Sequence, residues 1–191
     1  MDLKYLVLVT GLPGTGKSAV SKVIAQELGW DLHTILDARR DSGYSRYDPR
    51  TVLFGYQELI SRMNHSMARG RNVIIDALAH AQVTRYLIFS WVESYNHKGV
   101  ILECQCPSEV SISRMGGRAN KDVSLIDDPA DEGVYWKCAV KYQDLDRFVQ
   151  RHDVYLFRYL SHQNVFVRVK SDPEGIPLAD RIEDIITKHF K

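Results

Sequence analysis

The segment with the clearest capacity for chemistry runs from Gly11 to Ser18 and matches the pattern G-x-x-x-x-G-K-[ST] at every position. Glycines let the backbone approach a chain of phosphates and turn its N–H groups toward it, at the positive end of a helix that begins here. We expect Lys17 to reach the β- and γ-phosphates of a nucleotide and the Ser18 hydroxyl to bind Mg²⁺. A glycine turn with a chance lysine is the alternative, but a buried strand before the segment and an amphipathic helix after it favour a phosphate loop. The predicted nucleotide-binding residues are Gly11, Leu12, Pro13, Gly14, Thr15, Gly16, Lys17 and Ser18.

A second candidate is Asp76, which ends the apolar run Val-Ile-Ile-Asp at residues 73–76. A Mg²⁺ ion held by nucleotide phosphates needs a carboxylate at the end of a neighbouring strand, the role of the Walker B aspartate. Aspartates at strand ends are also common in plain turns. The phosphate loop upstream favours the metal role, so we predict Asp76 and Ser18 as the metal-binding residues.

Apolar spacing predicts the elements that position these residues. Residues 5–10 are continuously apolar, as in a strand buried on both faces of a parallel sheet, and residues 17–28 carry apolar side chains at helical spacing up to Gly29. Further strands are predicted over 33–36, 72–76, 99–104 and 164–169. Further helices are predicted over 53–70, 83–95 and 135–149, with others starting at Pro107 and Pro177.

Strand and helix alternate along the whole chain, and parallel strands need helical crossovers. The sequence therefore predicts one α/β domain over residues 1–191, a doubly wound parallel sheet of about five strands with its ligand at the carboxyl ends of the strands. Residues 116–130 contain glycine and charge without a sustained apolar period, and we expect them to form a lid.

Charge and hydropathy narrow the class of protein. The formal net charge is +1, so no global positive field draws the chain to nucleic acid, although a local basic channel stays open. No stretch approaches the roughly 20 apolar residues of a membrane span, and the first residues do not resemble a signal peptide. We expect a cytoplasmic protein without membrane association.

Cys104, Cys106 and Cys138 are an odd number of cysteines, which favours reduced thiols. Cys104 and Cys106 resemble half of a zinc site, but no second pair of cysteine or histidine stands at a matching interval. We therefore expect buried strand thiols.

The phosphate loop alone does not separate kinases from GTPases or motor ATPases. Asn120-Lys-Asp122 places its acid one position too early for the Asn-Lys-x-Asp motif that selects guanine. The chain is also too short for the extra helical domain of a ring-forming ATPase. A kinase using ATP and Mg²⁺ is the better interpretation.

With these residues placed, the sequence resembles the small P-loop kinases grouped with polynucleotide 5′-hydroxyl kinases and zeta-toxin-like proteins, over roughly residues 6–145. Those kinases carry an Asp followed three residues later by Arg after the second strand, as Asp37 and Arg40 do here. The resemblance implies that Asp37 aligns the attacking hydroxyl and accepts its proton, and that Arg40 clamps an anionic part of the acceptor. A plain surface contact between Asp37 and Arg40 is the alternative.

The resemblance continues toward the predicted lid. A helix that starts near Pro107 and Glu109 leads to Arg114 and Arg118, four residues apart, and Asp-Val-Ser follows at 122–124. The resemblance implies that at least one of these arginines stabilises the charge of the moving phosphoryl group. Solvated lid arginines are the alternative. The sequence departs from the family at Leu78, where a small hydroxyl residue is usual, so the acceptor pocket differs there.

These observations predict an ATP-dependent kinase whose acceptor hydroxyl belongs to a nucleotide, a nucleic-acid 5′ end or a small metabolite. The alternative is an ATP-binding regulatory switch or an NTPase without a phosphoryl acceptor. Nothing in the sequence requires nucleic acid, and nothing indicates an oligomeric state. The predicted catalytic residues are Lys17, Asp37, Arg114 and Arg118.

Overall fold

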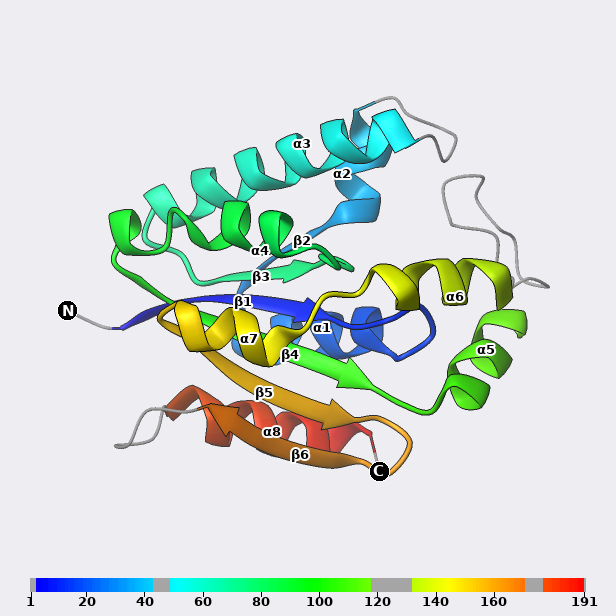
Figure 1. Ribbon diagram of the computed structural model, residues 1–191. Coiled ribbons are helices and arrows are strands. Elements are labelled where there is room, and N and C mark those ends of the chain that lie inside the picture. Colours follow the sequence, from blue (N-terminus) through cyan, green and yellow to red (C-terminus); the bar gives the residue numbers. More distant parts are fainter. Residues whose placement is uncertain (1–2, 43–48, 118–131, 171–176, 191) are drawn as a thin grey trace.

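The computed structural model describes residues 3–42, 49–117, 132–170 and 177–190. Six strands form one sheet in the order β2-β3-β1-β4-β5-β6 (Figure 1). Each neighbouring pair among the first five strands is parallel, whereas β6 is antiparallel to β5. The strands are β1 (Lys4–Thr10), β2 (Asp31–Thr34), β3 (Val73–Asp76), β4 (His97–Gln105), β5 (Val154–Leu160) and β6 (Val165–Lys170).

Helices cover both faces of this sheet, and Figure 1 shows α7 in front of it and α1 behind it. Between β1 and β4 the chain forms α1 (Lys17–Leu28), α2 (Ile35–Asp41), α3 (Pro49–Ala68), α4 (Gln82–Phe89) and the 3₁₀ turn η1 (Glu93–Tyr95). After β4 it forms α5 (Ser108–Gly116), α6 (Glu132–Lys141), α7 (Leu145–Arg151) and α8 (Pro177–His189).

The packing of β1 explains why its sequence is apolar throughout. Its odd-numbered side chains, such as Val7, enter a core shared with α1 and α8, and Leu6 and Leu8 enter a second core with α3, α4 and α7. Because successive side chains of a strand point to opposite faces, a strand covered on both faces needs apolar residues at every position. The predicted doubly wound α/β fold is confirmed, with helices α1 and α3 near their predicted positions.

The antiparallel β6 and the strand β5 differ from the prediction of about five parallel strands. Residues 154–160 were not predicted as a strand, and 135–149 were predicted as one helix. In the structure α6 ends at Lys141 and α7 begins at Leu145, because the Asp144 side chain caps α7 by accepting a 2.8 Å hydrogen bond from the Asp146 N–H.

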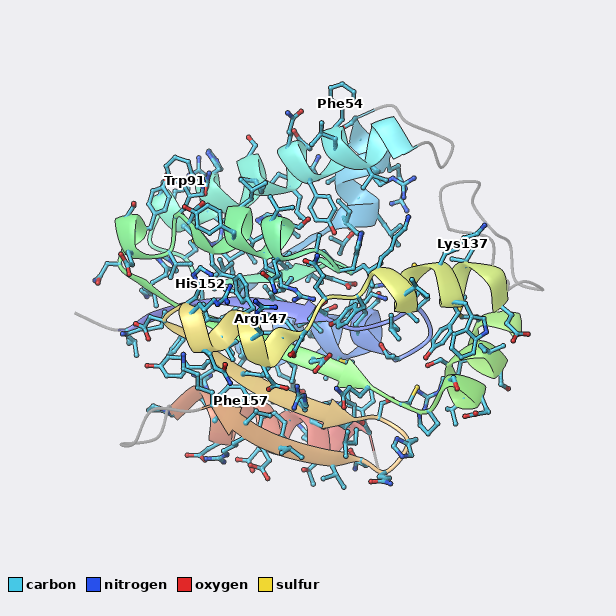
Figure 2. The ribbon with its side chains drawn as sticks, viewed as in Figure 1. Phe54, Trp91, Lys137, Arg147, His152 and Phe157 are labelled. Atoms are coloured by element: carbon cyan, nitrogen blue, oxygen red, sulfur yellow. The ribbon has the colours of Figure 1, made fainter. Side chains whose placement is uncertain are left out.

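Helix α4 buries a different face from the one that apolar spacing indicates. Val83 and Leu87 are exposed, and Trp91 lies at the surface (Figure 2). Arg85, Ile88 and Phe89 are buried instead. Apolar periodicity misplaces the face because an arginine, with its donors satisfied by backbone carbonyls, occupies the centre of the buried side.

The second strand also ends earlier than predicted. Strand β2 stops at Thr34 because the Thr34 side chain caps α2, accepting a 3.0 Å hydrogen bond from the Asp37 N–H. Among the helices of the described ranges, none combines the length and the apolar character that a bilayer crossing needs.

Candidate active site

The glycine loop joins the end of β1 to the start of α1 at the carboxyl edge of the sheet. Gly11 and Gly14 have φ angles of 142° and 81°, and a Cβ atom would lie 2.2 Å from the Cys104 carbonyl oxygen at Gly11 and 2.3 Å from the Ser111 carbonyl oxygen at Gly14. Side chains are therefore excluded at both positions by the neighbouring backbone. The loop lies against the end of β4 and against α5, which leaves its other side for a ligand.

The loop is also braced from within. The Thr15 hydroxyl donates a 2.8 Å hydrogen bond to the Leu12 carbonyl, and the Gly16 carbonyl accepts from the N–H groups of Ala19 and Val20. Lys17 and Ser18 then occupy the first turn of α1, and both side chains are half-buried. The first N–H groups of a helix have no partner within it, so this arrangement suits an anion.

Behind the loop, the Cys104 thiol is buried on β4, and this burial raises its pKa above the ordinary range. A thiol held in its neutral form is a poor nucleophile and a poor metal ligand. Cys104 therefore fits the expectation of a buried strand thiol, whereas Cys106 follows the end of β4 and is only half-buried.

Asp76 ends β3 beside the glycine loop. Its residue is 5% exposed and stands opposite Val9 of β1 and Thr34 of β2 in the sheet register. Within the described residues its carboxylate accepts no hydrogen bond and forms no ion pair. A buried carboxylate without a protein partner fits a cation, and Mg²⁺ is commonly held by one carboxylate together with hydroxyl, phosphate and water oxygens. Asp76 and Ser18 would hold that ion, whose chemistry is to neutralise charge on the phosphates.

Asp37 lies in the first turn of α2, directly after the strand next to Asp76. The Thr34 hydroxyl donates a 2.7 Å hydrogen bond to Asp37 Oδ2, and the Arg40 guanidinium donates a 2.9 Å hydrogen bond to Oδ1. Both charged side chains are about half exposed, at 49% for Asp37 and 54% for Arg40. The structure thus shows Asp37 and Arg40 in a surface contact, the alternative left open by the sequence, with the carboxylate oriented by two donors and about half exposed. The catalytic role of Asp37 and the acceptor contact of Arg40 stay predictions.

Arg114 lies near the end of α5 and reaches the turn between β5 and β6. Its guanidinium donates to the Ser161 hydroxyl at 2.9 Å and to the Ser161 carbonyl at 3.4 Å. A Cβ atom added to Gly16 would lie 4.0 Å from the Ser161 Cβ, so this turn adjoins the start of α1. Arg114 is therefore held close to the phosphate loop.

The placement of Arg118 stays a prediction. Helix α5 ends at Gly116, and Arg118 lies outside the described residues. Most of the predicted lid, residues 118–130, also lies outside them. Arg39 of α2 is buried, and its side chain lies over Gly55 of α3.

A cavity of about 400 Å³ adjoins the glycine loop between the ends of β4 and β5 and the end of α6. Four of its polar lining residues were not predicted from the sequence: Glu103, Gln105, Tyr142 and His162. Glu103 is buried and accepts hydrogen bonds from Arg158 at 2.8 Å and from Gln105 at 2.9 Å. Burial also raises the pKa of the Tyr142 hydroxyl above its ordinary range. One feature of the sequence indicated some of them: Glu103 and Gln105 stand at alternate positions where the apolar run of β4 ends.

The strand order, the glycine loop between β1 and α1, and the carboxylate at the end of β3 define a P-loop protein of the kinase type. The model of the family described as "Chromatin associated protein KTI12" matches residues 5–188. The chain belongs to this family.

Solved structures agree with this fold. A "putative kinase" from Chloroflexus aurantiacus superposes with a TM-score of 0.65 at 15% identity, with 100% of both chains covered. Kti12 of Chaetomium thermophilum, solved in complex with ADP-AlF3, gives a TM-score of 0.63 at 16% identity over 97% of this chain and 99% of that one. The predicted resemblance to small P-loop kinases is confirmed by the fold of these structures.

Among curated proteins, a "Putative adenylate kinase" of Thermococcus gammatolerans is 30% identical over 76 residues, or 39% of this chain. The chain spans 42% of the length of that relative. The similarity is therefore restricted to part of both proteins.

Proposed function

We propose that this chain binds ATP with Mg²⁺ and transfers the γ-phosphoryl group to an acceptor hydroxyl of a nucleotide, a nucleic-acid 5′ end or a small metabolite. The observation that carries the proposal is the presence of two carboxylates, Asp37 and Asp76, after neighbouring strand ends. A protein that only bound a nucleotide would need Asp76, whereas an oriented and accessible Asp37 also suits an acceptor hydroxyl. Two carboxylates in separate environments suit separate roles, one toward the metal and one toward the acceptor.

The nucleotide side of the proposal rests on the glycine loop and the first turn of α1. The N–H groups at that helix start offer donors for the phosphates, and Lys17 supplies a positive charge for the β- and γ-phosphates. Asp76 is largely buried, and no donor among the described residues bonds to its carboxylate, as expected of a residue that binds a cation. ATP and Mg²⁺ are accordingly the proposed ligands.

On the acceptor side, Asp37 has the exposure and the orientation that a proton acceptor needs. The Thr34 hydroxyl and Arg40 fix both carboxylate oxygens, which restricts rotation of the side chain without covering it. A hydroxyl placed against Asp37 would be aligned for attack on the γ-phosphorus. Its proton would pass to the carboxylate as the new P–O bond forms and the bond from the γ-phosphorus to the departing ADP breaks. Arg40 is the proposed contact for an anionic group of the acceptor.

Arg114 is the proposed source of positive charge on the far side of the loop. Its present hydrogen bonds to Ser161 hold it near the start of α1, from where a small rotation would bring it to the phosphates. A guanidinium that meets the moving phosphoryl group stabilises the charge that develops there. Arg118 is proposed for the same role from the lid.

A regulatory nucleotide switch, or an NTPase without an acceptor, is a second candidate. One observation favours it: both oxygens of Asp37 already have donors within or next to α2, where the residue supports the start of the helix. In that case Asp37 serves local structure, and water is the only acceptor.

The experiment that separates these candidates measures ADP formation with nucleosides, nucleoside monophosphates, 5′-hydroxyl oligonucleotides and small alcohols as acceptors. A kinase shows acceptor-dependent stimulation together with phosphorylated product, and Asp37→Asn abolishes both while ATP affinity is kept. Asp41→Asn is the matched control, because Asp41 lies in the same helix and pairs with Arg62 at 2.9 Å. Equal ADP formation with every acceptor, unchanged in Asp37→Asn, supports the second candidate.

A further inference from the structure

Arg85 of α4 is the largest of the completely buried side chains in the described residues, with 0% exposure. A guanidinium keeps its charge at physiological pH, so its burial requires hydrogen-bond acceptors. The acceptors are three backbone carbonyls: Nε donates to Ala79 at 2.8 Å, and the terminal nitrogens donate to His80 at 3.2 Å and Asp144 at 3.4 Å. No carboxylate of the described ranges lies within ion-pair distance of it, although Tyr142, Glu103 and Asp144 lie near enough to favour its charged form. Arg85 therefore binds two separate segments of the backbone.

The first place is the segment 77–80, which directly follows Asp76. This segment is also held by β1, since Ala77 N–H donates to the Val9 carbonyl at 3.3 Å and the Thr10 hydroxyl donates to the Leu78 carbonyl at 2.5 Å. Ala79 has a φ angle of 39°, in the left-handed region that non-glycine residues seldom adopt. Such a conformation persists only when surrounding contacts impose it, and the Arg85 bond to the Ala79 carbonyl is one of them.

The second place is the link of residues 142–144 between α6 and α7. The Arg85 guanidinium lies 5.1 Å from the centre of the Tyr142 ring and donates to the Asp144 carbonyl. The same link reaches the first place directly, because Gln143 N–H donates to the His80 carbonyl at 2.9 Å. In addition, the Gln143 side-chain oxygen accepts a 2.5 Å hydrogen bond from the Gln82 N–H at the start of α4.

These contacts join the metal side of the site to the helix that follows the predicted lid. Helix α6 begins at Glu132 and runs from the side of α5 toward α7 (Figure 1). We call residues 142–144, which follow its C-terminal end, the base of α6. One buried guanidinium thus fixes the backbone after Asp76 and the base of α6 together. A shift of either would leave a buried charge with unpaired donors, which is costly.

We propose that Arg85 is a positioning residue for the metal-bound nucleotide, holding the segment after Asp76, and with it the Asp76 carboxylate, against the base of α6. The inference rests on the proposed role of Asp76 in holding Mg²⁺. Arg85 itself touches neither nucleotide nor metal. Its effect is therefore expected on the gain in nucleotide affinity that Mg²⁺ produces, since the glycine loop keeps its own internal hydrogen bonds.

The test is nucleotide binding by the full chain, followed with a fluorescent, non-hydrolysable ATP analogue with and without Mg²⁺. For the wild type, Mg²⁺ should tighten binding. Arg85→Lys and Arg85→Met should keep the metal-free Kd within about twofold. They should lose about tenfold of the affinity gained from Mg²⁺, because a small displacement of the Asp76 carboxylate weakens its contact with the ion strongly. The lysine variant keeps the charge but cannot serve three carbonyls, so it tests the fork geometry. Ile182→Ala, buried in α8 on the opposite face of the sheet, is the control for general loss of stability.

A milder variant covers the case in which Arg85 variants do not fold. Gln143 is exposed, and Gln143→Ala removes the acceptor of the Gln82 N–H without opening the core. It should lose about threefold of the Mg²⁺ gain, less than the Arg85 variants, because it removes one neutral hydrogen bond and leaves the buried guanidinium in place. Gln150→Ala, exposed on α7, should behave as wild type.

The outcomes separate the two proposals. A wild-type protein whose affinity is unaffected by Mg²⁺ overturns the metal role of Asp76 and the role of Arg85 with it. A wild-type protein with a clear Mg²⁺ gain that is kept in folded Arg85 variants, or in Gln143→Ala when those do not fold, overturns the Arg85 inference alone. Arg85 would then be a core residue that serves packing.

Discussion

Thr34 and Asp76 are register partners in the parallel pairing of β2 with β3, and each is the last residue of its strand. The Thr34 hydroxyl also accepts from the Asp37 N–H and donates to Asp37 Oδ2. The pairing of β2 with β3 therefore fixes the position of Asp37, proposed for the acceptor, relative to Asp76, proposed for the metal. In the proposed reaction Thr34 would position Asp37 without itself touching a substrate.

Thr34→Val should reduce both stability and turnover. The change removes the cap of α2, which costs about 1 kcal/mol of unfolding free energy, and it removes the donor that orients Asp37. We expect kcat to fall by about tenfold while the affinity for ATP stays the same. Steady-state kinetics and chemical denaturation measure the two effects. Thr34→Ser keeps both hydrogen bonds and should restore both values; a turnover defect in the serine variant would contradict this role.

Lys17→Met should abolish phosphoryl transfer and leave the fold intact. Lys17 is half-buried in the first turn of α1 and belongs to neither core cluster, so its loss removes a phosphate contact and little packing. The assay is transfer of labelled γ-phosphate, with circular dichroism to follow folding. Lys22→Met, on the exposed side of the same helix, is the control and should transfer phosphate normally. Normal turnover in Lys17→Met would remove the glycine loop from the proposed mechanism.

Gly14→Ala should destabilise the protein and weaken nucleotide binding together. The added Cβ would meet the Ser111 carbonyl oxygen at 2.3 Å, so either the loop or α5 must move. Gly29→Ala also places alanine at a positive φ, of 65°, but meets nothing within 4 Å. Gly29→Ala should therefore cost only about 1 kcal/mol of backbone strain and leave nucleotide affinity unchanged. Equal effects of the two changes on nucleotide affinity would show that loop crowding by α5 is unimportant.

The parts of the site that the sequence predicted are those encoded locally. The glycine loop is one continuous segment, and Asp76 was found because an acidic residue ends an apolar strand. Asp37 and Arg40, implied by the family resemblance, pair across one turn of α2. Local spacing gives such contacts directly, because helix geometry fixes which side chains meet.

The parts that were missed depend on residues far apart in the chain. Tyr142 meets Thr10 across 132 positions, and Arg85 meets Asp144 across 59. Strand β5 escaped notice because Arg158 interrupts its apolar pattern, yet Glu103 and Asp146 both pair with that arginine in the fold. A buried charge is acceptable only with its partner, and a single sequence does not reveal which distant residue the partner is.

Stability should fall as the pH falls below about 6.5, the ordinary pKa of histidine. Burial lowers the pKa of His33, whose ring lies 3.0 Å from the Ser66 hydroxyl, and burial also lowers the pKa of His80. A lowered pKa in the folded state means that the unfolded chain binds more protons, so the stabilisation is complete above the unfolded pKa and is lost as the pH falls toward the folded one. Urea denaturation at pH 7.5 and 5.5 should show this loss, and His33→Asn should make it smaller. An unchanged loss in His33→Asn would assign the pH dependence to other groups.

Arg114→Ala should lower kcat far more than it raises the KM for ATP. In the described structure Arg114 bonds to Ser161, beside the start of α1, so it has partners before any phosphoryl group moves and gains its new contact during transfer. Removing one charged donor of this kind costs about 10²-fold in kcat. Arg147→Ala is the control, because Arg147 is an exposed arginine of α7 (Figure 2), away from the glycine loop. A raised KM with an unchanged kcat would instead assign Arg114 to binding of the nucleotide before transfer. The transition-state role would then pass to Arg118, and Arg118→Ala would have to show the loss of kcat that Arg114→Ala lacked.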